Sequence, residues 1–193
     1  NTQLLKQRGV SLLEPDVGLQ ACGETGAGRL MDVPDIVTAL ASRFRTASLA
    51  GRHVVITAGP TREAIDPVRY ISNHSSGKQG YALALAAIEA GARVTLISGP
   101  TNINAPDRAT VVAVQSADEM LEAVMSSIRD ADIFIGVAAV ADYKPVSALN
   151  QKIKKSAGSA LTLDLVQNQD ILKTVANLEN RPFTVGFAAE TEN

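Results

Sequence analysis

Aromatic residues are scarce in this sequence, and tryptophan is absent altogether. Phenylalanine, tyrosine and tryptophan together make up 4% of the 193 residues. The hydrophobic core must therefore be built from alanine, valine, isoleucine and leucine. This composition favours sheets and helices packed in layers over an aromatic-rich β-sandwich.

Cysteine and long apolar runs are scarce as well. Cys22 is the single cysteine, so an intrachain disulfide is impossible, which fits a reducing compartment. No apolar run reaches the length of a membrane span, and the first residues lack the basic-then-apolar pattern of a signal peptide. We therefore expect a cytoplasmic protein with no membrane partner. Because the sequence begins at Asn1 rather than at a methionine, we also expect a piece of a longer protein.

An excess of charge of one sign is also missing. The formal net charge is −2, which argues against a nucleic acid as the principal partner. Two nucleotide-binding fingerprints are missing too, since neither G-x-G-x-x-G after the first strand nor G-x-x-x-x-G-K-[S/T] occurs. Local clusters of basic residues can still bind a small molecule that carries phosphate.

The first part of the chain does not look like a domain that folds alone. Residues 22–30 are too rich in glycine for a helix or a central strand, and Pro34 marks the start of a short helix over residues 35–45. Residues 46–52 are small, polar and basic, so we expect a linker there. These patterns predict a short irregular N-terminal segment, 1–45, before the main domain, 53–193.

From residue 53 onward strands and helices alternate, which predicts a Rossmann-like α/β fold with a mostly parallel sheet and helices on both faces. The pattern stops before such a fold would be complete, so we expect a domain truncated at its C-terminus. Strands are expected at 53–58, 93–98, 110–114, 132–138, 161–166 and 183–188, and helices at 79–90, 116–128 and 170–178.

A long polar stretch, 59–80, lies between the first strand and the first helix of this domain. Open α/β sheets bind ligands at the carboxyl ends of their strands, where this stretch begins. Long polar loops in compact domains are usually functional or disordered. We therefore expect the stretch to be a loop that forms part of a functional site.

Three cations lie within that stretch, Arg62, Arg69 and Lys78. Guanidinium groups bind phosphate or carboxylate with two hydrogen bonds at once. The alternative is that they form only weak surface salt bridges with Glu63 and Asp66.

Two further side chains of the stretch could contact a ligand. Asn73 has an amide that can hold a carbonyl or phosphate oxygen without changing charge. His74 could act as an acid or base, but a lone histidine in a loop is more often structural.

Three more regions carry possible chemistry. Residues 136–143 are small enough for a flat base to approach the backbone, and Asp142 can accept hydrogen bonds, although close packing explains small residues equally well. The basic run 152–155 is either a solvated loop or a mobile lid with phosphate-binding lysines. Cys22 is either an inert thiol or a catalytic group.

Together these motifs closely resemble the bacterial bifunctional phosphopantothenoylcysteine decarboxylase/phosphopantothenate–cysteine ligase of coenzyme A biosynthesis. The resemblance runs over the whole chain. It is carried by ACGETGAGR (21–29), GPTRE (59–63), DPVRYISNHSSGK (66–78), AAVADY (138–143), KIKK (152–155) and GFAAE (186–190).

For residues 1–45 the resemblance implies the substrate clamp of the decarboxylase domain. Cys22 would protonate the enethiolate that decarboxylation leaves. FMN would bind only to a decarboxylase body that this chain lacks, so the chain itself should not decarboxylate.

For residues 53–193 the resemblance implies an incomplete ligase domain that joins 4′-phosphopantothenate to L-cysteine with CTP and Mg²⁺, through an acyl-cytidylate. Asn73 would hold the acyl-cytidylate, Arg69 would assist amide formation, and Lys152 would come from a lid and stabilise charge on the phosphate. The implied nucleotide-binding residues are Gly136, Val137, Ala138, Asp142, Lys152, Asn168, Gln169, Asp170, Ile171 and Phe187. The ligands of Mg²⁺ stay open, and the full-length protein would be a homo-oligomer.

Two other classes of function stay open at this point. A Rossmann-like sheet is also found in NAD(P)-dependent oxidoreductases, although the missing glycine fingerprint argues against that class. A non-catalytic module could use the same cations to dock a phosphorylated ligand.

Overall fold

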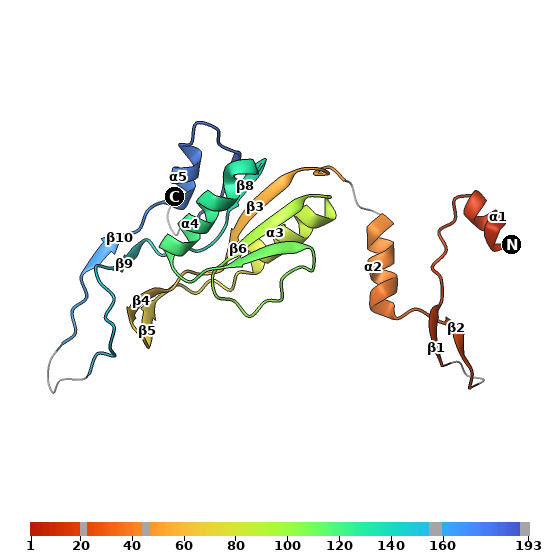
Figure 1. Cartoon of the computed structure of the whole chain (residues 1–193), viewed down its shortest axis with the longest axis horizontal. Helices are drawn as coiled ribbons and strands as arrows, with labels where there is room; N and C mark the ends of the chain where they lie inside the picture. The colour runs from red at the N-terminus through yellow and green to blue at the C-terminus, as the bar shows by residue number, and fades with distance from the viewer. Residues whose placement is uncertain (20–22, 44–46, 155–159, 190–193) are drawn as a thin grey trace. The chain divides into compact units, whose positions relative to one another are not determined.

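The computed structural model describes residues 1–19, 23–43, 47–154 and 160–189. Cys22 lies outside these ranges, so its predicted role stays a prediction. The chain divides into two compact units, Asn1–Thr46 and Ala47–Asn193, and Figure 1 shows the elements of each. Within the described ranges, no helix combines the length and apolarity that crossing a membrane requires.

The first unit contains two helices and one two-stranded ribbon. Helices α1 (Thr2–Gln7) and α2 (Val33–Arg43) flank the antiparallel strands β1 (Asp16–Leu19) and β2 (Thr25–Arg29). This segment is more regular than the sequence predicted, because glycines that would weaken a central strand are tolerated in an isolated exposed ribbon. None of its described side chains is fully buried. Its assignment as a substrate clamp stays a prediction.

The second unit is built on a sheet of five parallel strands in the order β11-β8-β3-β6-β7. The central strand, β3 (His53–Ala58), is buried along its whole length. Its neighbours are β6 (Arg93–Ser98) and β8 (Ile133–Gly136), and the edges are β7 (Ala109–Ala113) and β11 (Phe183–Gly186). The predicted Rossmann-like architecture is therefore confirmed.

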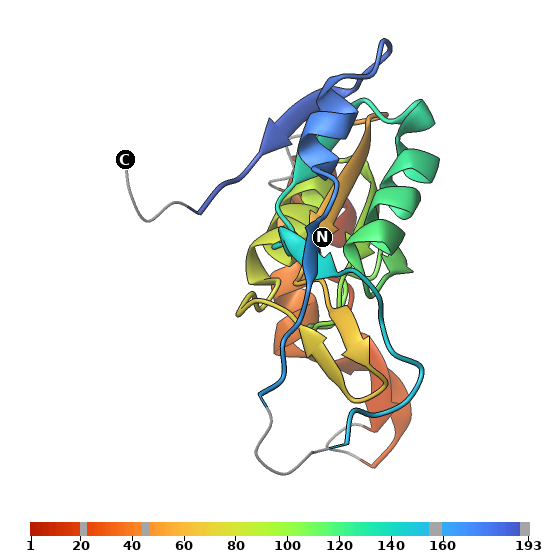
Figure 2. The ribbon, with the colours of Figure 1, turned by 90° about the vertical axis from the view of Figure 1, so that its left-hand side faces the viewer.

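Helices cover both faces of this sheet, as Figure 2 shows with α3 and α4 on opposite sides. Helix α3 (Lys78–Glu89) packs against the face that carries Val54 and Ile56. Helix α4 (Ala117–Ser127), the 3₁₀ turn η1 (Ile128–Asp130) and helix α5 (Ile171–Ala176) cover the other face, with Val55. Neighbouring residues of a strand point to opposite faces, so one apolar strand supplies both cores.

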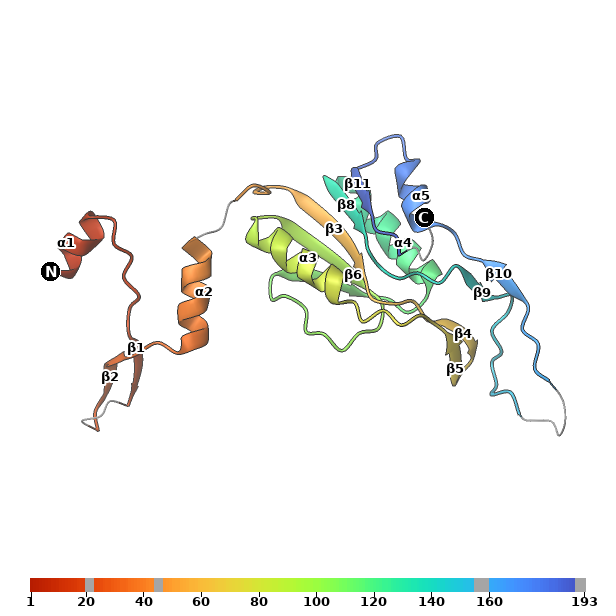
Figure 3. The same ribbon diagram turned by 180° about the vertical axis from the view of Figure 1, so that it is seen from behind.

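Two separate antiparallel ribbons extend beyond the sheet (Figure 3). One is β4 (Glu63–Asp66) with β5 (Arg69–Ile71), and the other is β9 (Tyr143–Pro145) with β10 (Leu165–Gln167). The prediction of a continuous loop over 59–80 was thus wrong, because β4 and β5 form a hairpin inside it. The strand predicted over 161–166 was misplaced, and β10 is exposed rather than half-buried because it pairs with β9 alone within the described chain.

The start of α3 packs very closely on the end of β3. A Cβ atom added to Gly80 would lie 2.5 Å from Ala58 Cβ and 3.2 Å from the Thr57 carbonyl oxygen. Neither atom belongs to a flexible side chain, so the helix would have to move away from the strand.

We therefore expect Gly80→Ala to lower the free energy of unfolding by about 1–3 kcal/mol, the usual cost of overpacking. Without the clash, the better helix propensity of alanine would stabilise α3 by about 1 kcal/mol. Urea unfolding measures the change, and Gln79→Ala on the exposed side of α3 is the control. A variant more stable than the wild type would contradict the tight contact.

Candidate nucleotide-binding site

The order of the strands reverses between β3 and β8. From β3 the chain moves outward to β6 and β7, and then returns to place β8 on the other side of β3. Such a switch point opens a crevice at the carboxyl ends of the two strands, where open α/β sheets bind ligands. A pocket of about 560 Å³ lies there, lined by Thr57 and Phe134, by residues 136 and 138–142, by residues 167–172 and by residues 187–189.

Two threonine hydroxyl groups hold the loop that follows β8. Thr57 Oγ1 accepts hydrogen bonds from the Val137 and Ala138 N–H groups, both at 3.2 Å. Thr61 Oγ1 accepts one from the Ala141 N–H at 3.0 Å. Both threonines are at most 2% exposed, so no water can replace these hydroxyls. The floor of the pocket is therefore fixed from β3 and its extension.

Neither threonine was predicted from the sequence. The available signal was a polar residue at the end of a fully buried strand, where an unpaired hydroxyl is costly and usually bonds a neighbouring backbone. The backbone of Ala139 extends the same pairing, because its N–H donates to the Gly59 carbonyl and its carbonyl accepts from the Thr61 N–H.

Asn168 also lines the pocket. Its backbone N–H donates to the Asp142 carbonyl at 2.8 Å, and its Nδ2 donates to the Ala141 carbonyl at 2.8 Å. Its Oδ1 has no hydrogen-bond partner, and it is the one buried side-chain polar atom in that state among the described residues. The amide nitrogen of Asn168 thus fixes the side chain, while the amide oxygen remains an acceptor without a donor.

The structure brings most of the predicted nucleotide-binding residues together in this pocket. Those that line it are Gly136, Ala138, Asp142, Asn168, Gln169, Asp170, Ile171 and Phe187. Val137 does not line it, and its N–H is bonded to Thr57. Lys152 does not line it either.

Asn73 lies next to the pocket. Its Nδ2 donates to the carbonyl of Ala139, a residue of the pocket lining, and its Oδ1 accepts from the Ser75 N–H at 3.1 Å. Both ends of the amide are therefore engaged, and they fix the stretch before α3 against the loop after β8. His74 is exposed and does not line the pocket.

Arg69 and Lys152 belong to a second group of residues at the β4–β5 hairpin. Arg69 Nη2 donates to the carbonyl of Ile153 at 3.1 Å, and its Nη1 lies 3.6 Å from Asp66 Oδ2. Lys152, the neighbour of Ile153, is exposed. Arg69 therefore contacts the residue that follows Lys152. Neither of these two predicted catalytic cations lines the pocket.

Two other charged residues of the 59–80 stretch, Glu63 and Arg62, contact other parts of the fold, whereas Lys78 is exposed at the start of α3. Glu63 is buried, and its Oε1 accepts from the N–H of Ala117 in the first turn of α4. The guanidinium of Arg62 lies over the ring of Tyr70, 4.7 Å from its centroid. The alternative of salt bridges within the stretch thus holds for Arg69 with Asp66.

Asp66 is a buried carboxylate that stays ionised. Burial would raise its pKa, but hydrogen bonds from the Val68, Ile153 and Arg69 N–H groups, together with the Arg69 charge, outweigh burial and hold the pKa below its usual value. The bonds from the Val68 and Arg69 N–H groups to the Asp66 side chain stabilise an Asp-Pro turn. This turn forms the hairpin, which was not predicted from the sequence.

Comparison with known proteins shows the family of this chain. Residues 49–193 match the family described as the DNA/pantothenate metabolism flavoprotein C-terminal domain. The chain belongs to this family. It is similar over its whole length to the coenzyme A biosynthesis bifunctional protein CoaBC of Escherichia coli K12, with 49% identity, and of Vibrio vulnificus YJ016, with 50% identity.

The matched chain spans about half the length of these relatives, 48% and 49% respectively. Among solved structures, the C-terminal domain of a CoaBC protein matches 77% of this chain and 69% of its own, with 46% identity and a TM-score of 0.66. A family member from Streptococcus pneumoniae matches 69% of this chain and 67% of its own, with 25% identity and a TM-score of 0.59. These relatives place the sheet and its switch point within the flavoprotein C-terminal domain family.

We expect Thr57→Val to lower the free energy of unfolding by about 1–3 kcal/mol, because two buried N–H groups lose their acceptor. Thr57→Ser keeps the hydroxyl and removes one methyl group, so its loss should stay near about 1 kcal/mol. Urea unfolding compares the two variants. Equal stability of the valine variant and the wild type would show that the hydroxyl does not hold the loop.

Proposed function

We propose that this chain carries a ligase site that joins 4′-phosphopantothenate to L-cysteine at the expense of CTP. Its membership of the flavoprotein C-terminal domain family and its similarity to bifunctional coenzyme A biosynthesis proteins support the reaction class. The observation that carries the nucleotide is the switch-point pocket with its unpaired Asn168 oxygen.

The chemistry requires activation of the acid. A carboxylate does not react with an amine until one of its oxygens becomes a good leaving group. We propose that the carboxylate of 4′-phosphopantothenate attacks the α-phosphate of CTP, which forms an acyl-cytidylate and releases pyrophosphate. The amine of cysteine then attacks the acyl carbon, forms the amide and releases CMP.

The base is selected by hydrogen bonding at Asn168. A buried acceptor without a partner costs about 1–3 kcal/mol, and a ligand that donates to it removes that cost. The exocyclic amino group of cytosine is such a donor, whereas uracil has a carbonyl oxygen at the same position. The residues Ala138 to Ala141 line the same pocket, and their small side chains let a flat base approach the backbone.

Carboxylates at the pocket suit a metal bound together with phosphate. Within the described ranges, no group of three or more histidine, cysteine, aspartate or glutamate side chains gathers around one point. Mg²⁺ is commonly held by one or two carboxylates plus substrate phosphates, so this donor set fits an ion that arrives with the triphosphate. Asp142 would hold it, because Asp170 Oδ1 accepts from the Lys173 N–H and caps α5. The ion would neutralise charge on the triphosphate.

The three remaining catalytic proposals follow from the resemblance to the ligase family. Asn73 holds the acyl-cytidylate from its place beside Ala139. Arg69 assists amide formation, and Lys152 stabilises negative charge on the transferring phosphate, which is the kind of electrostatic help that catalysis uses most. Decarboxylation through Cys22 stays a prediction of the resemblance, as does a homo-oligomeric full-length protein.

We expect the purified protein to bind CTP about tenfold to a hundredfold more tightly than UTP, which corresponds to the cost of the unpaired acceptor. In Asn168→Leu the ratio of the two dissociation constants should move toward one. Isothermal titration of CTP, UTP and ATP measures it. A ratio that is unchanged in the variant would contradict base selection at Asn168, and ATP binding as tight as CTP binding would contradict the assignment of the nucleotide.

We expect cysteine-dependent release of pyrophosphate from CTP and 4′-phosphopantothenate, with Lys152→Gln lowering kcat about 10²- to 10³-fold. The dissociation constant of CTP should change much less, because Lys152 acts on charge that develops during transfer. Arg129→Gln removes one exposed positive charge elsewhere and is the matched control. Unchanged turnover in the Lys152 variant would contradict its catalytic role, and no release of pyrophosphate by the wild type would favour a non-catalytic binding module.

A further inference from the structure

The segment that carries Lys152 is bonded to the β4–β5 hairpin through both backbone groups of Ile153, the residue that follows Lys152. The Ile153 N–H donates to Asp66 Oδ2 at 3.1 Å, and the Ile153 carbonyl accepts from Arg69 Nη2 at 3.1 Å. Both backbone groups of one residue are thus held by two side chains of the hairpin. We propose that Asp66 is a positioning residue that sets the place of Lys152 for catalysis, an inference that rests on the proposed ligase function.

The geometry of Asp66 suits this role. Its Oδ1 accepts from the Val68 and Arg69 N–H groups at 2.8 and 2.9 Å, which fixes the carboxylate within the turn of its own hairpin. Its Oδ2 is then directed at Ile153 from 87 residues away in sequence. The side chain is fully buried, so the carboxylate has no freedom to turn elsewhere.

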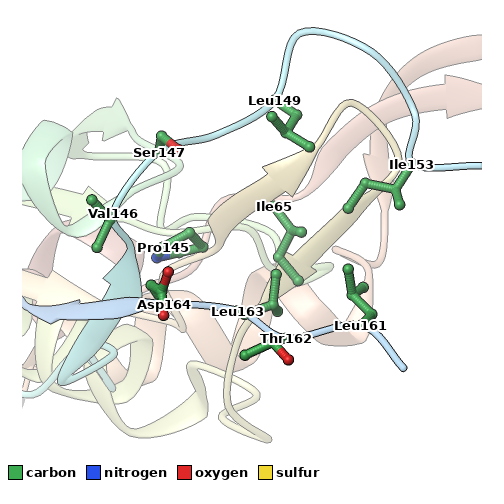
Figure 4. Close-up of a pocket in the computed structure, with 10 residues that line it drawn as sticks. All are labelled: Ile65, Pro145, Val146, Ser147, Leu149, Ile153, Leu161, Thr162, Leu163 and Asp164. Carbon is green, nitrogen blue, oxygen red and sulfur yellow. The ribbon is translucent and has the colours of Figure 1, made fainter. Parts of the chain in front are cut away.

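A second contact fixes the same segment upstream of Lys152. The Leu149 N–H donates to the carbonyl of Ile65, the neighbour of Asp66, at 3.0 Å. Figure 4 shows the side chains of Leu149 and Ile153 near Ile65 and Leu161, around a pocket of about 240 Å³. Lys152 therefore lies between two attachment points on one hairpin, while its own side chain remains exposed.

Arg69 links this attachment to the reaction. Its guanidinium contacts both the Asp66 carboxylate and the Ile153 carbonyl, so the hairpin carries one proposed catalytic cation and fixes the backbone beside the other. A displacement of Asp66 would move the backbone at Ile153, and Lys152 with it. Asp66 does not line the pocket, so it acts on the reaction through the position of Lys152.

Asp66→Asn tests the proposal with almost no change in shape. The single oxygen of asparagine is best used on the two N–H groups of the turn, which leaves an NH₂ group facing the Ile153 N–H, a donor against a donor. We expect the Ile153 amide to exchange with deuterium about tenfold faster or more, as loss of a hydrogen bond to a charged acceptor predicts. We expect kcat to fall about tenfold or more at a nearly constant dissociation constant for CTP.

A double-mutant comparison separates positioning of Lys152 from a general structural effect. If Asp66 acts through Lys152, adding Asp66→Asn to a Lys152→Gln protein should lower kcat little further. Asp132→Asn is the matched control, because Asp132 also bonds a backbone N–H, that of His53 at 2.8 Å, and a guanidinium, that of Arg52 at 2.7 Å. It should leave the exchange at Ile153 and kcat unchanged.

The possible results test two claims, the attachment of Ile153 to Asp66 and the positioning of Lys152 by Asp66. Unchanged exchange at Ile153 in Asp66→Asn overturns the attachment, and faster exchange with unchanged kcat, or effects that multiply with those of Lys152→Gln, overturns the positioning role. If the wild type releases no pyrophosphate, the ligase function fails while exchange still reports the attachment. Asp66→Ser, which can bond its own turn but cannot reach Ile153, replaces the asparagine variant if that variant unfolds. If both variants unfold, Asp66 is a folding residue and the proposal is wrong.

Discussion

The hydroxyl group of Thr57 is the contact on which the candidate site depends. Parallel pairing brings β3 and β8 side by side, but this pairing ends at Thr57 and Gly136. Beyond it, the chain after β8 could turn in many directions. The bonds from Val137 and Ala138 to the Thr57 hydroxyl and from Ala141 to the Thr61 hydroxyl continue the alignment, together with the backbone bonds of Ala139. The floor of the pocket is therefore an extension of the sheet, with the rigidity of the sheet.

The β4–β5 hairpin provides a different kind of support. It is separate from the five-stranded sheet, and its buried side chains are charged: Glu63 bonds the start of α4, and Asp66 bonds the segment around Ile153. One ribbon thus connects the helix on one face of the sheet with the segment that carries Lys152. The switch-point pocket and the two cations proposed as catalytic are supported by different parts of the fold. The hairpin follows directly from β3 and Thr61, which joins the two parts.

The sequence predicted the sheet far better than it predicted these connections. The stretch 93–98 predicted β6 with the bounds that the structure has, because its valine, leucine and isoleucine favour a strand. The helix predicted over 116–128 also agrees with the start of α4, where the Ser116 hydroxyl accepts from the Glu119 N–H. The hairpin was missed because Glu63 and Asp66 read as surface charges, and only distant partners, Ala117 and Ile153, make their burial possible. Residue identities pointed to the pocket, but the roles of Thr57 and Thr61 depend on contacts about 80 residues away.

The unpaired oxygen of Asn168 ties two properties of the protein to one atom. A substitution nearby that supplied a donor to this oxygen would make the empty protein more stable, since a buried acceptor would gain a partner. The same substitution would occupy the acceptor that we propose selects the base. Greater stability at this position would therefore be gained at the expense of the proposed discrimination between bases.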